Sequence, residues 1–398
     1  MTDTLLLQRE YTVPTYTDRK LALVLGDGVY LQDESGSRYL DFMSNYGIAI
    51  FGYRHPDITR RLTEQLERLP NLHGSFANDV RAEAARRLVA RCGGGLARVC
   101  FTNSGAEANE AALKFAVLAT GKKRFIACRG GYHGKTLGAL SATDSAKYRQ
   151  TLEPLIWDFR FIPYGEPEAL ERAIDNDTAA FIVEPIQGES GVRIPAEGYL
   201  GHAARICRSR GALMIVDEIQ TGTGRTGRFL ASHAEGLTYD IVTLGKGLAG
   251  GIPVGATLVS AAVARGVARG AHTSTFGGNP LAAAGILAVL ELMDQERLGH
   301  ISAIGKRFLE GLRGLPGPNI VEARGRGLMI GLELRRSRDE VLERLQREGV
   351  LAAPAGENVV RFLPPYIVEM THVDIVLGRL ERILASLAVE SDRQCAAF

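Results

Sequence analysis

The sequence has no excess of either charge and no long apolar run, and both absences exclude classes of function. Its 398 residues include 47 Lys and Arg against 45 Asp and Glu, a formal net charge of +2. So balanced a chain has no general attraction for nucleic acid or for an anionic membrane surface. No stretch approaches the roughly 20 apolar residues that span a bilayer. We therefore expect neither nucleic acid nor a membrane as a partner.

Cysteine is scarce, and its positions show no paired spacing. The five cysteines are scattered along the chain, at Cys92, Cys100, Cys128, Cys207 and Cys395. That pattern indicates neither a disulfide framework nor a metal site. The N-terminus, MTDTLLLQREYTVP, has too short an apolar run for a secretory signal and an early acid that a basic transit peptide lacks. These features predict a cytoplasmic protein with reduced thiols and no bound metal.

What the sequence does contain is the alternation typical of an α/β fold. Helical patterns such as HPDITRRLTEQLERL alternate with short apolar runs, namely ARVCFTN, KRFIACR, AAFIVEP, ALMIVDE and DIVTLGK. Helices alternating with fully apolar strands predict a mostly parallel sheet that is covered by helices on both faces. A chain of 398 residues is also too long for one small core, so we expect two domains.

Changes in the pattern predict three segments. Residues 1–50 carry turn signals between short alternating runs, which predicts a meander packed with a smaller domain. Residues 51–285 hold the alternating pattern of the large domain. In residues 286–398 a long helical stretch leads to IVEARGRGLMIGLEL, another helix, VVRFLPP and a closing amphipathic helix, which predicts a small α+β domain.

A glycine-rich segment, IVDEIQTGTGRTG at 215–227, matches the G-x-G-x-x-G turn of nicotinamide-binding proteins. In that turn the third glycine opens a helix whose N-terminus holds the pyrophosphate. Gly227 is followed instead by RFLASHAEG, a weak helix former, and Asp240 precedes its strand where a ribose-binding acid would close it. We interpret the segment as an irregular loop, with a nicotinamide oxidoreductase as the lesser alternative.

Asp217 and Lys246 each follow an apolar strand, at the carboxyl ends where open α/β sheets bind ligands. The two residue types suit pyridoxal phosphate, because a lysine amine forms an imine with its aldehyde while a carboxylate keeps its ring nitrogen protonated. The glycines around Lys246 are expected to leave its amine room for a bulky reactant. Considered alone, each residue is more often a surface lysine or a turn carboxylate.

A candidate phosphate site makes the pair persuasive. In VCFTNSGAEANEAALKFA a strand runs into a long helix, which places Ser104, Gly105 and Ala106 at the helix N-terminus. Unpaired backbone N–H groups and the helix dipole favour a phosphate there. The alternative is an ordinary N-cap formed by Asn103 or Ser104.

Together these motifs resemble the class III, or ω-amino, aminotransferases of pyridoxal-phosphate fold type I. Seven segments follow that family's order along nearly the whole chain: TNSGAEANEAALKFA, GGYHGKTLGALS, VEPIQGESGV, IVDEIQTGTGRTGRF, TLGKGLAGGIPVGA, TSTFGGNPLAAA and VVRFLPP. The likeness is strongest to the acetylornithine and acetyl-lysine aminotransferases. It implies transfer of a terminal amino group from an ω-amino substrate to 2-oxoglutarate, with pyridoxal 5'-phosphate as cofactor.

The resemblance also implies a role for each cofactor residue. Lys246 would be the Schiff-base lysine and proton shuttle, and Asp217 would pair with the pyridinium nitrogen. Gln220 would hydrogen-bond the ring hydroxyl, and Tyr132 would stack on the ring, with His133 beside it in the cofactor site.

The phosphate would be held by Ser104, Gly105 and Ala106, joined by Thr275 of a second subunit. That contribution implies an obligate homodimer with shared active sites.

Two acids and an arginine complete the site that the resemblance implies. Glu184 would be a buried carboxylate near the cofactor, in a supporting role. Glu189 would be the family's gate, which pairs with an arginine while the amine donor is bound and releases it for 2-oxoglutarate. The arginine would be Arg361, whose planar fork suits a carboxylate; its alternative is a surface charge at a strand edge.

Lys135 departs from the family, which usually has Phe/Tyr-His-Gly-Arg where this chain has YHGK. Lysine cannot make the two parallel hydrogen bonds of a guanidinium, so a carboxylate would be bound more weakly or differently here. A diamine such as putrescine therefore competes with N-acetylornithine as donor, and ornithine and γ-aminobutyrate also stay open. A further alternative is an aminomutase or racemase of the same fold.

Overall fold

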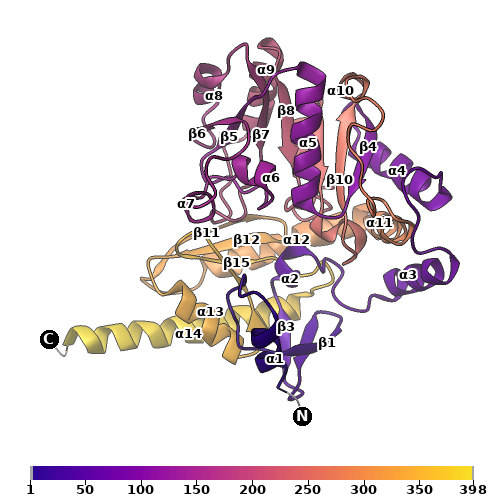
Figure 1. Cartoon of the computed structure of the whole chain (residues 1–398). Helices are drawn as coiled ribbons and strands as arrows, with labels where there is room; N and C mark the ends of the chain where they lie inside the picture. The colour runs from indigo at the N-terminus through magenta and orange to yellow at the C-terminus, as the bar shows by residue number, and fades with distance from the viewer. Residues whose placement is uncertain (1–2, 397–398) are drawn as a thin grey trace.

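The computed structural model describes the backbone of residues 3–396 and the side chains of residues 3–388, so the Cys395 thiol lies outside the described part. Its largest element is a seven-stranded sheet in the order β4-β10-β9-β8-β7-β5-β6 (Figure 1). The strands are β4 (Leu96–Thr102), β5 (Arg124–Cys128), β6 (Asp158–Ile162), β7 (Thr178–Val183), β8 (Leu213–Asp217), β9 (Ile241–Leu244) and β10 (Gly255–Ser260).

The sheet is mostly parallel, as the apolar runs predict. Strands β9, β8, β7, β5 and β6 pair in parallel, and β10 alone runs antiparallel to its neighbours β4 and β9. Each of the five apolar runs named above forms a strand. Every residue of β7 is buried, which explains why this strand shows no polar alternation.

Helices cover both faces of this sheet. Along β7, Phe181 and Val183 pack in one core cluster with α4, α8, α9 and α11, whereas Ala180 and Ile182 pack in another with α5 and α10. Successive side chains of a strand point to opposite faces, so the two clusters lie on opposite sides. These helices are α4 (Asp79–Cys92), α5 (Gly105–Thr120), α8 (Pro167–Ala173), α9 (Tyr199–Ser209), α10 (Ala261–Arg265) and α11 (Pro280–Leu292).

Two four-stranded sheets lie beneath the large sheet in Figure 1. The antiparallel sheet β11-β12-β15-β14 consists of β11 (Ile320–Arg326), β12 (Met329–Leu334), β14 (Ala353–Ala355) and β15 (Val359–Phe362). The other consists of β1 (Leu23–Asp27), β2 (Tyr30–Asp33), β3 (Arg38–Asp41) and β13 (Val350–Leu351), which pairs in parallel with β3. The N-terminal meander thus pairs with a strand from the C-terminal part of the chain.

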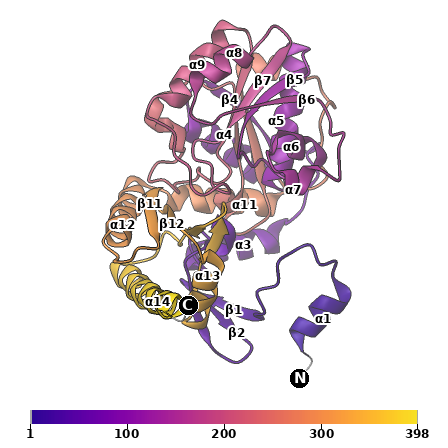
Figure 2. The ribbon, with the colours of Figure 1, turned by 90° about the vertical axis from the view of Figure 1, so that its left-hand side faces the viewer.

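The helices α12, α13 and α14 pack in the core with these sheets. In Figure 1 α14 lies in the lower part of the molecule, and in Figure 2 α1 stands apart from the rest. The remaining helices are α1 (Thr4–Tyr11), α2 (Ser44–Gly47), α3 (Pro56–Arg68), α6 (Leu137–Ala142), α7 (Ala146–Arg149), α12 (Gln295–Arg313), α13 (Arg338–Arg347) and α14 (Met370–Ala396), with the 3-10 turns η1 (Ala231–Glu235) and η2 (Lys246–Ala249). None of the described helices is both long and apolar enough to cross a bilayer.

The long helical stretch expected after residue 280 is in fact two helices. Asp294 ends the continuity, because its carboxylate accepts a hydrogen bond from Arg297 N at 2.7 Å and so caps α12. The expected boundary at residue 285 falls inside α11, whose residues Ile286 and Val289 belong to two different cores. Division into 1–50, 51–285 and 286–398 therefore stays a proposal.

Candidate active site

A cavity of about 480 Å³ opens at the carboxyl ends of the parallel strands. Most of the residues expected at the site line it: Gly105, Ala106, Tyr132, His133, Lys135, Glu184, Asp217, Gln220 and Lys246. Ser104, Glu189, Arg361 and Thr275 are not among the lining residues. Ser104 directly precedes Gly105, and Glu189 and Arg361 each hydrogen-bond Gln220, so these three lie next to lining residues. Thr275, in contrast, is exposed in the loop between α10 and α11.

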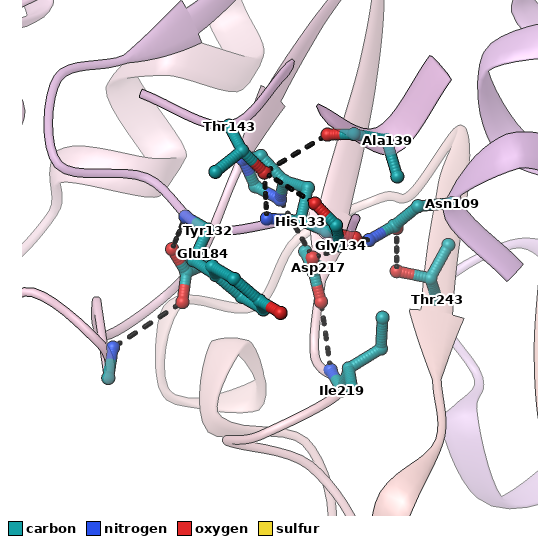
Figure 3. Close-up of polar contacts among 11 residues, drawn as sticks. Asn109, Tyr132, His133, Gly134, Ala139, Thr143, Glu184, Asp217, Ile219 and Thr243 are labelled. Atoms are coloured by element: carbon teal, nitrogen blue, oxygen red, sulfur yellow. Dashed lines mark hydrogen bonds and ion pairs between the residues drawn. The ribbon is translucent and has the colours of Figure 1, made fainter. Parts of the chain in front are cut away.

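Asp217, the last residue of β8, is buried and held from three directions (Figure 3). Its Oδ2 accepts a hydrogen bond from Asn109 Nδ2 at 2.8 Å and lies 2.8 Å from His133 Nδ1, while Oδ1 accepts from Ile219 N at 3.0 Å. Thr243 of the neighbouring strand β9 donates to Asn109 Oδ1 at 2.8 Å. The carboxylate is therefore fixed in position before any ligand arrives.

Asn109 is a functional residue that sequence reasoning missed. It lies in α5, about one turn from the helix N-terminus, and is fully buried among alanines. A buried amide inside a helix has to find partners, and here they are the carbonyl of His133 at 2.7 Å and the carboxylate of Asp217. The Asn within the alanine-rich segment AEANEAAL was the available signal.

His133 lies on the other side of Asp217 and is 3 % exposed. Burial lowers its pKa, but the hydrogen bond to Asp217 and that residue's charge outweigh burial, so the net pKa is raised. Its backbone N–H donates to Thr143 Oγ1 at 2.9 Å, which fixes the loop after β5 (Figure 3). The imidazole therefore stabilises the negative charge of Asp217 through this hydrogen bond.

Lys246 follows β9 in a left-handed conformation, with φ of 49°. The glycines on both sides of Lys246 allow close packing of the backbone. The expectation above was that they leave room for a reactant. A Cβ on Gly245 would lie 3.2 Å from Gly105 Cα, and one on Gly247 would lie 2.4 Å from Ile50 Cγ2. Burial lowers the pKa of the Lys246 amine, which favours the neutral nucleophile.

The N-terminus of α5 faces the same cavity. Ser104 is its N-cap, and its hydroxyl accepts a hydrogen bond from Glu107 N at 3.2 Å. Gly105 and Ala106 hold the first helical positions, where backbone N–H groups have no partner within the helix. A Cβ on Gly105 would lie 2.8 Å from Ile219 Cγ2, so glycine keeps this end of the cavity open. The N-cap at Ser104 is compatible with an anion site at Gly105 and Ala106.

Glu184 is a buried acid beneath Tyr132. Its two oxygens accept hydrogen bonds from Tyr132 N at 3.0 Å and from Gly188 N at 3.4 Å (Figure 3). Burial raises the pKa of Glu184 to about 7, with the negative charge of Asp217 adding to the effect. Tyr132 is half-buried, and burial raises the pKa of its hydroxyl to about 12.

Glu189, Gln220 and Arg361 form one cluster. Arg361 Nη1 donates to Glu189 Oε1 at 2.6 Å and to Gln220 Oε1 at 3.1 Å, and Gln220 Nε2 donates to Glu189 at 3.2 Å. Burial opposes ionisation of Glu189, but the charge of Arg361 outweighs it and lowers the pKa. The surface alternative for Arg361 is wrong: β15 lies between β12 and β14, and the side chain is 0 % exposed.

Two N–H groups of Arg361, on Nε and Nη2, are buried and have no hydrogen-bond partner among the described residues. Buried donors are normally satisfied, so an unsatisfied guanidinium edge indicates a site for an incoming acceptor. The geometry of that edge suits the two oxygens of a carboxylate.

Lys135 is exposed at the rim of the cavity, with Nζ 4.2 Å from the centre of the Tyr148 ring. The contact is a cation–π interaction that holds the amine near α7. No carboxylate among the described residues forms an ion pair with it.

A second feature absent from the predictions is a left-handed turn in α2. Ser44, Asn45, Tyr46 and Gly47 have φ values of 45°, 49°, 59° and 86°. A Cβ on Gly47 would lie 3.8 Å from Lys246 Cδ, so the turn lies against the lysine stem. Consecutive left-handed residues are strained and concentrate at functional sites, but they have no distinctive sequence pattern.

The cavity accommodates a flat ring with a phosphate tail. The carboxylate of Asp217 is fixed in the cavity by three contacts. Lys246, whose amine has a lowered pKa, and the first N–H groups of α5 also line the cavity. These groups fit the ring nitrogen, the aldehyde and the phosphate of pyridoxal phosphate. Fold and site together define a pyridoxal-phosphate-dependent transferase of fold type I.

The chain belongs to the class III aminotransferases, whose family model, aminotransferase class-III, matches residues 13–384. It is 41 % identical to an acetylornithine aminotransferase of Methanopyrus kandleri over 93 % of this chain and 96 % of the relative. It is 39 % identical to a LysW-aminoadipate semialdehyde transaminase of Deinococcus radiodurans, over 97 % and 91 %. The ornithine aminotransferase structure from Toxoplasma gondii ME49 aligns with a TM-score of 0.92 and 36 % identity, covering 98 % and 95 %.

The resemblance seen in the sequence is thereby confirmed. The protein is a pyridoxal-phosphate-dependent aminotransferase, which takes an amine donor and an oxo-acid acceptor. The nicotinamide alternative is rejected, and the structure shows why its glycine pattern misleads: Gly227, with φ of 84°, turns a loop and opens no helix.

Proposed function

We propose that the enzyme moves the terminal amino group of an N-acetylornithine or N-acetyl-lysine type of substrate to 2-oxoglutarate, giving a semialdehyde and glutamate. The observation that carries this proposal is the buried Arg361 with two unsatisfied N–H groups and a releasable partner in Glu189. When Glu189 swings away, the full guanidinium edge is free for the distal carboxylate of a dicarboxylic acceptor.

The bound cofactor supplies an aldehyde for the substrate amine and a ring that accepts electrons. Lys246 would move the proton at the amine-bearing carbon, and burial helps because it lowers the pKa of the amine. Asp217, held by His133 and Asn109, keeps a proton on the ring nitrogen. Gln220 hydrogen-bonds the ring hydroxyl, and Tyr132 covers the ring face.

Ser104, Gly105 and Ala106 hold the phosphate, and Thr275 of a second copy completes that site. Thr275 lies next to Phe276, which is 56 % exposed, and further apolar side chains such as Tyr16 are exposed as well. An interface that covers this loop would bury Phe276 together with Thr275. We therefore infer a homodimer with shared active sites. We also infer that the enzyme is cytoplasmic.

The donor is assigned less directly than the acceptor. The names of the Methanopyrus and Deinococcus relatives support an N-acylated ω-amine or a carrier-bound one. Lys135 supports a second candidate, because a single ammonium held over Tyr148 binds a donor carboxylate less firmly than a guanidinium does. That candidate is a diamine, which has no carboxylate. Ornithine, which has one, is supported instead by the name of the Toxoplasma neighbour.

A donor panel with 2-oxoglutarate tests the proposal. N-acetylornithine, N-acetyl-lysine, ornithine, putrescine and γ-aminobutyrate are ranked by kcat/KM, and an N-acetylated donor is expected to rank first. A higher value for putrescine would transfer the assignment to the second candidate. Transfer of ¹⁵N from the donor into glutamate excludes an aminomutase or racemase, and its failure with every donor would contradict the reaction itself.

A further inference from the structure

The loop Glu218–Gly227, which carries the misleading glycine pattern, has a role that the site described above does not use. It begins directly after Asp217, contains Gln220, and then leaves the large domain to touch the segment that follows β15. Gly224 suits this position because its φ is 90°, which other residues rarely adopt, and a Cβ would lie 2.0 Å from Met293 Cε, so the Met293 side chain would have to move. At the tip of the loop lies Arg225.

Arg225 is 1 % exposed, and no carboxylate of the described residues forms an ion pair with it. Its Nη1 donates to the carbonyl oxygens of Leu328 at 3.1 Å and Pro364 at 2.6 Å. Its own carbonyl oxygen accepts from Leu328 N at 2.9 Å, and its guanidinium lies 4.7 Å from the centre of the Tyr366 ring. A buried cation without an anion is costly. The contacts of Nη1 and of the Tyr366 ring offset part of that cost, while Nη2 is buried without a hydrogen-bond partner among the described residues.

These contacts tie the two halves of the carboxylate site together. Pro364 lies three residues after Arg361 on one chain segment, and Gln220 lies five residues before Arg225 on the other. Gln220 and Arg361 meet directly, through the 3.1 Å hydrogen bond from Nη1 to Oε1. Tyr366 reinforces the same junction, because its hydroxyl donates to the carbonyl oxygen of Thr223 at 3.0 Å.

We propose that Arg225 is a positioning residue that fixes Arg361 relative to Gln220 and Glu189, and so sets the affinity for the dicarboxylic acceptor. This inference rests on the proposed function of Arg361. The planar guanidinium suits the task, since one nitrogen reaches two carbonyl oxygens while the plane lies against the Tyr366 ring. Displacement of either segment by about 1 Å would spoil a bidentate geometry and lower efficiency by up to roughly a hundredfold.

The test compares Arg225→Met, Arg225→Lys and Tyr366→Phe in the cofactor-loaded enzyme. Arg225→Met is expected to raise the KM for 2-oxoglutarate about tenfold or more, while single-turnover conversion of the bound cofactor by the donor changes little. Arg225→Lys should recover part of the loss, and Tyr366→Phe should shift KM in the same direction by less. The last two variants keep the inference testable if Arg225→Met folds poorly.

Binding of glutarate, an unreactive dicarboxylate, gives a readout that does not depend on turnover. Glutarate should raise the unfolding midpoint of the wild-type enzyme, because a ligand of the folded state stabilises it. The rise should be reduced in Arg225→Met and absent in Arg361→Met. The matched control is Arg91→Met, since Arg91 also donates to a main-chain carbonyl oxygen, that of Met293, and lies over the Phe229 ring. Arg91 borders the same loop, but its hydrogen bond to Met293 does not reach the cluster of Glu189, Gln220 and Arg361.

The outcomes distinguish a failure of the positioning role of Arg225 from a failure of the carboxylate-binding role of Arg361. If Arg361→Met loses glutarate but Arg225→Met keeps both glutarate binding and the wild-type KM, Arg225 has no positioning role. Equal loss of both half-reactions in Arg225→Met and Arg91→Met, in proportion to a lower unfolding midpoint, would reduce Arg225 to a stabilising residue. If glutarate does not bind the wild type, the assignment of Arg361 fails, and the inference fails with it.

Discussion

Asp217 shows what a single residue needs before it can act on a cofactor. Its charge is compensated by His133 and Asn109, and its orientation is fixed by Ile219 N. The position at a strand end is predictable from sequence, because a buried strand followed by an acid is a local pattern. The pairing with its partners is not, because Asn109 and His133 come from segments more than 80 residues away. The polar Asn109 inside its helix was a local signal, and His133 was named only through the family resemblance.

Asp217→Asn should retain cofactor but lower kcat by roughly a hundredfold or more, because the amide no longer holds a proton on the ring nitrogen. Steady-state kinetics and the absorbance of the bound cofactor measure the two effects. Asp240→Asn is the matched control, since Asp240 accepts a hydrogen bond from Met214 N at the opposite end of the same strands. Wild-type kcat in Asp217→Asn would contradict the assigned role.

Glu184 makes stability depend on pH in the cofactor-free protein. Its pKa rises from 4.5 to about 7, and one pKa unit corresponds to about 1.4 kcal/mol. A raised carboxyl pKa gives stability that is complete below pH 4.5 and is lost as the pH rises through 7. Between pH 4.5 and 8, Glu184→Gln should therefore gain about 3 kcal/mol in unfolding free energy relative to wild type.

Urea unfolding at several pH values measures this difference. Glu67→Gln, on an exposed face of α3, should follow the wild-type pH dependence. A difference between Glu184→Gln and wild type that does not change with pH would mean that Glu184 titrates normally.

At the scale of elements, the N-terminus of α5 combines a structural and a binding task. Ser104→Ala removes the N-cap and should lower the unfolding free energy by about 1 kcal/mol. If the hydroxyl also contacts the phosphate, the variant should lose pyridoxal phosphate faster on dialysis. Ser260→Ala is the matched control, because Ser260 caps α10 through Val263 N without facing the cavity. Equal cofactor retention in both variants would leave Ser104 as a cap alone.

Elements also show how far sequence reasoning reaches. The strands β4, β5, β7, β8 and β9 were predictable because each is a short apolar run between turn signals. The break between α11 and α12 was missed because the apolar pattern continues through Met293, and only the cap at Asp294 marks it. The left-handed turn of α2 was missed because tertiary contacts, such as that of the Ser44 hydroxyl with Leu363 O, impose it.

At the scale of the whole molecule, the site depends on contacts between parts of the chain that are far apart. Glu189 and Arg361 are 172 residues apart, and Asp217 and His133 are 84 apart. No local pattern indicates such pairs. The resemblance to a family provided the pair of Glu189 and Arg361, but not the pair of Asp217 and His133. The proposed second subunit adds Thr275, whose place beside a partner cannot be read from one chain.

Subunit mixing tests the shared site. Lys246→Ala and Thr275→Asp should each inactivate the homodimer, the first by removing the reactive amine and the second by placing a negative charge at the phosphate. In a mixed dimer with shared sites, one site carries both changes and the other none, so activity should return to about a quarter of wild type at equal mixing of the two chains. No recovery in demonstrably mixed dimers would show that each chain supplies its own residue at 275.

The most direct test of the account is where the cofactor attaches. Borohydride reduction of the purified enzyme, followed by peptide mass spectrometry, should place a pyridoxyl group on the ε-nitrogen of Lys246. Lys246→Ala should show no adduct and no turnover. An adduct on a different lysine, or turnover by Lys246→Ala at the wild-type rate, would contradict the central claim.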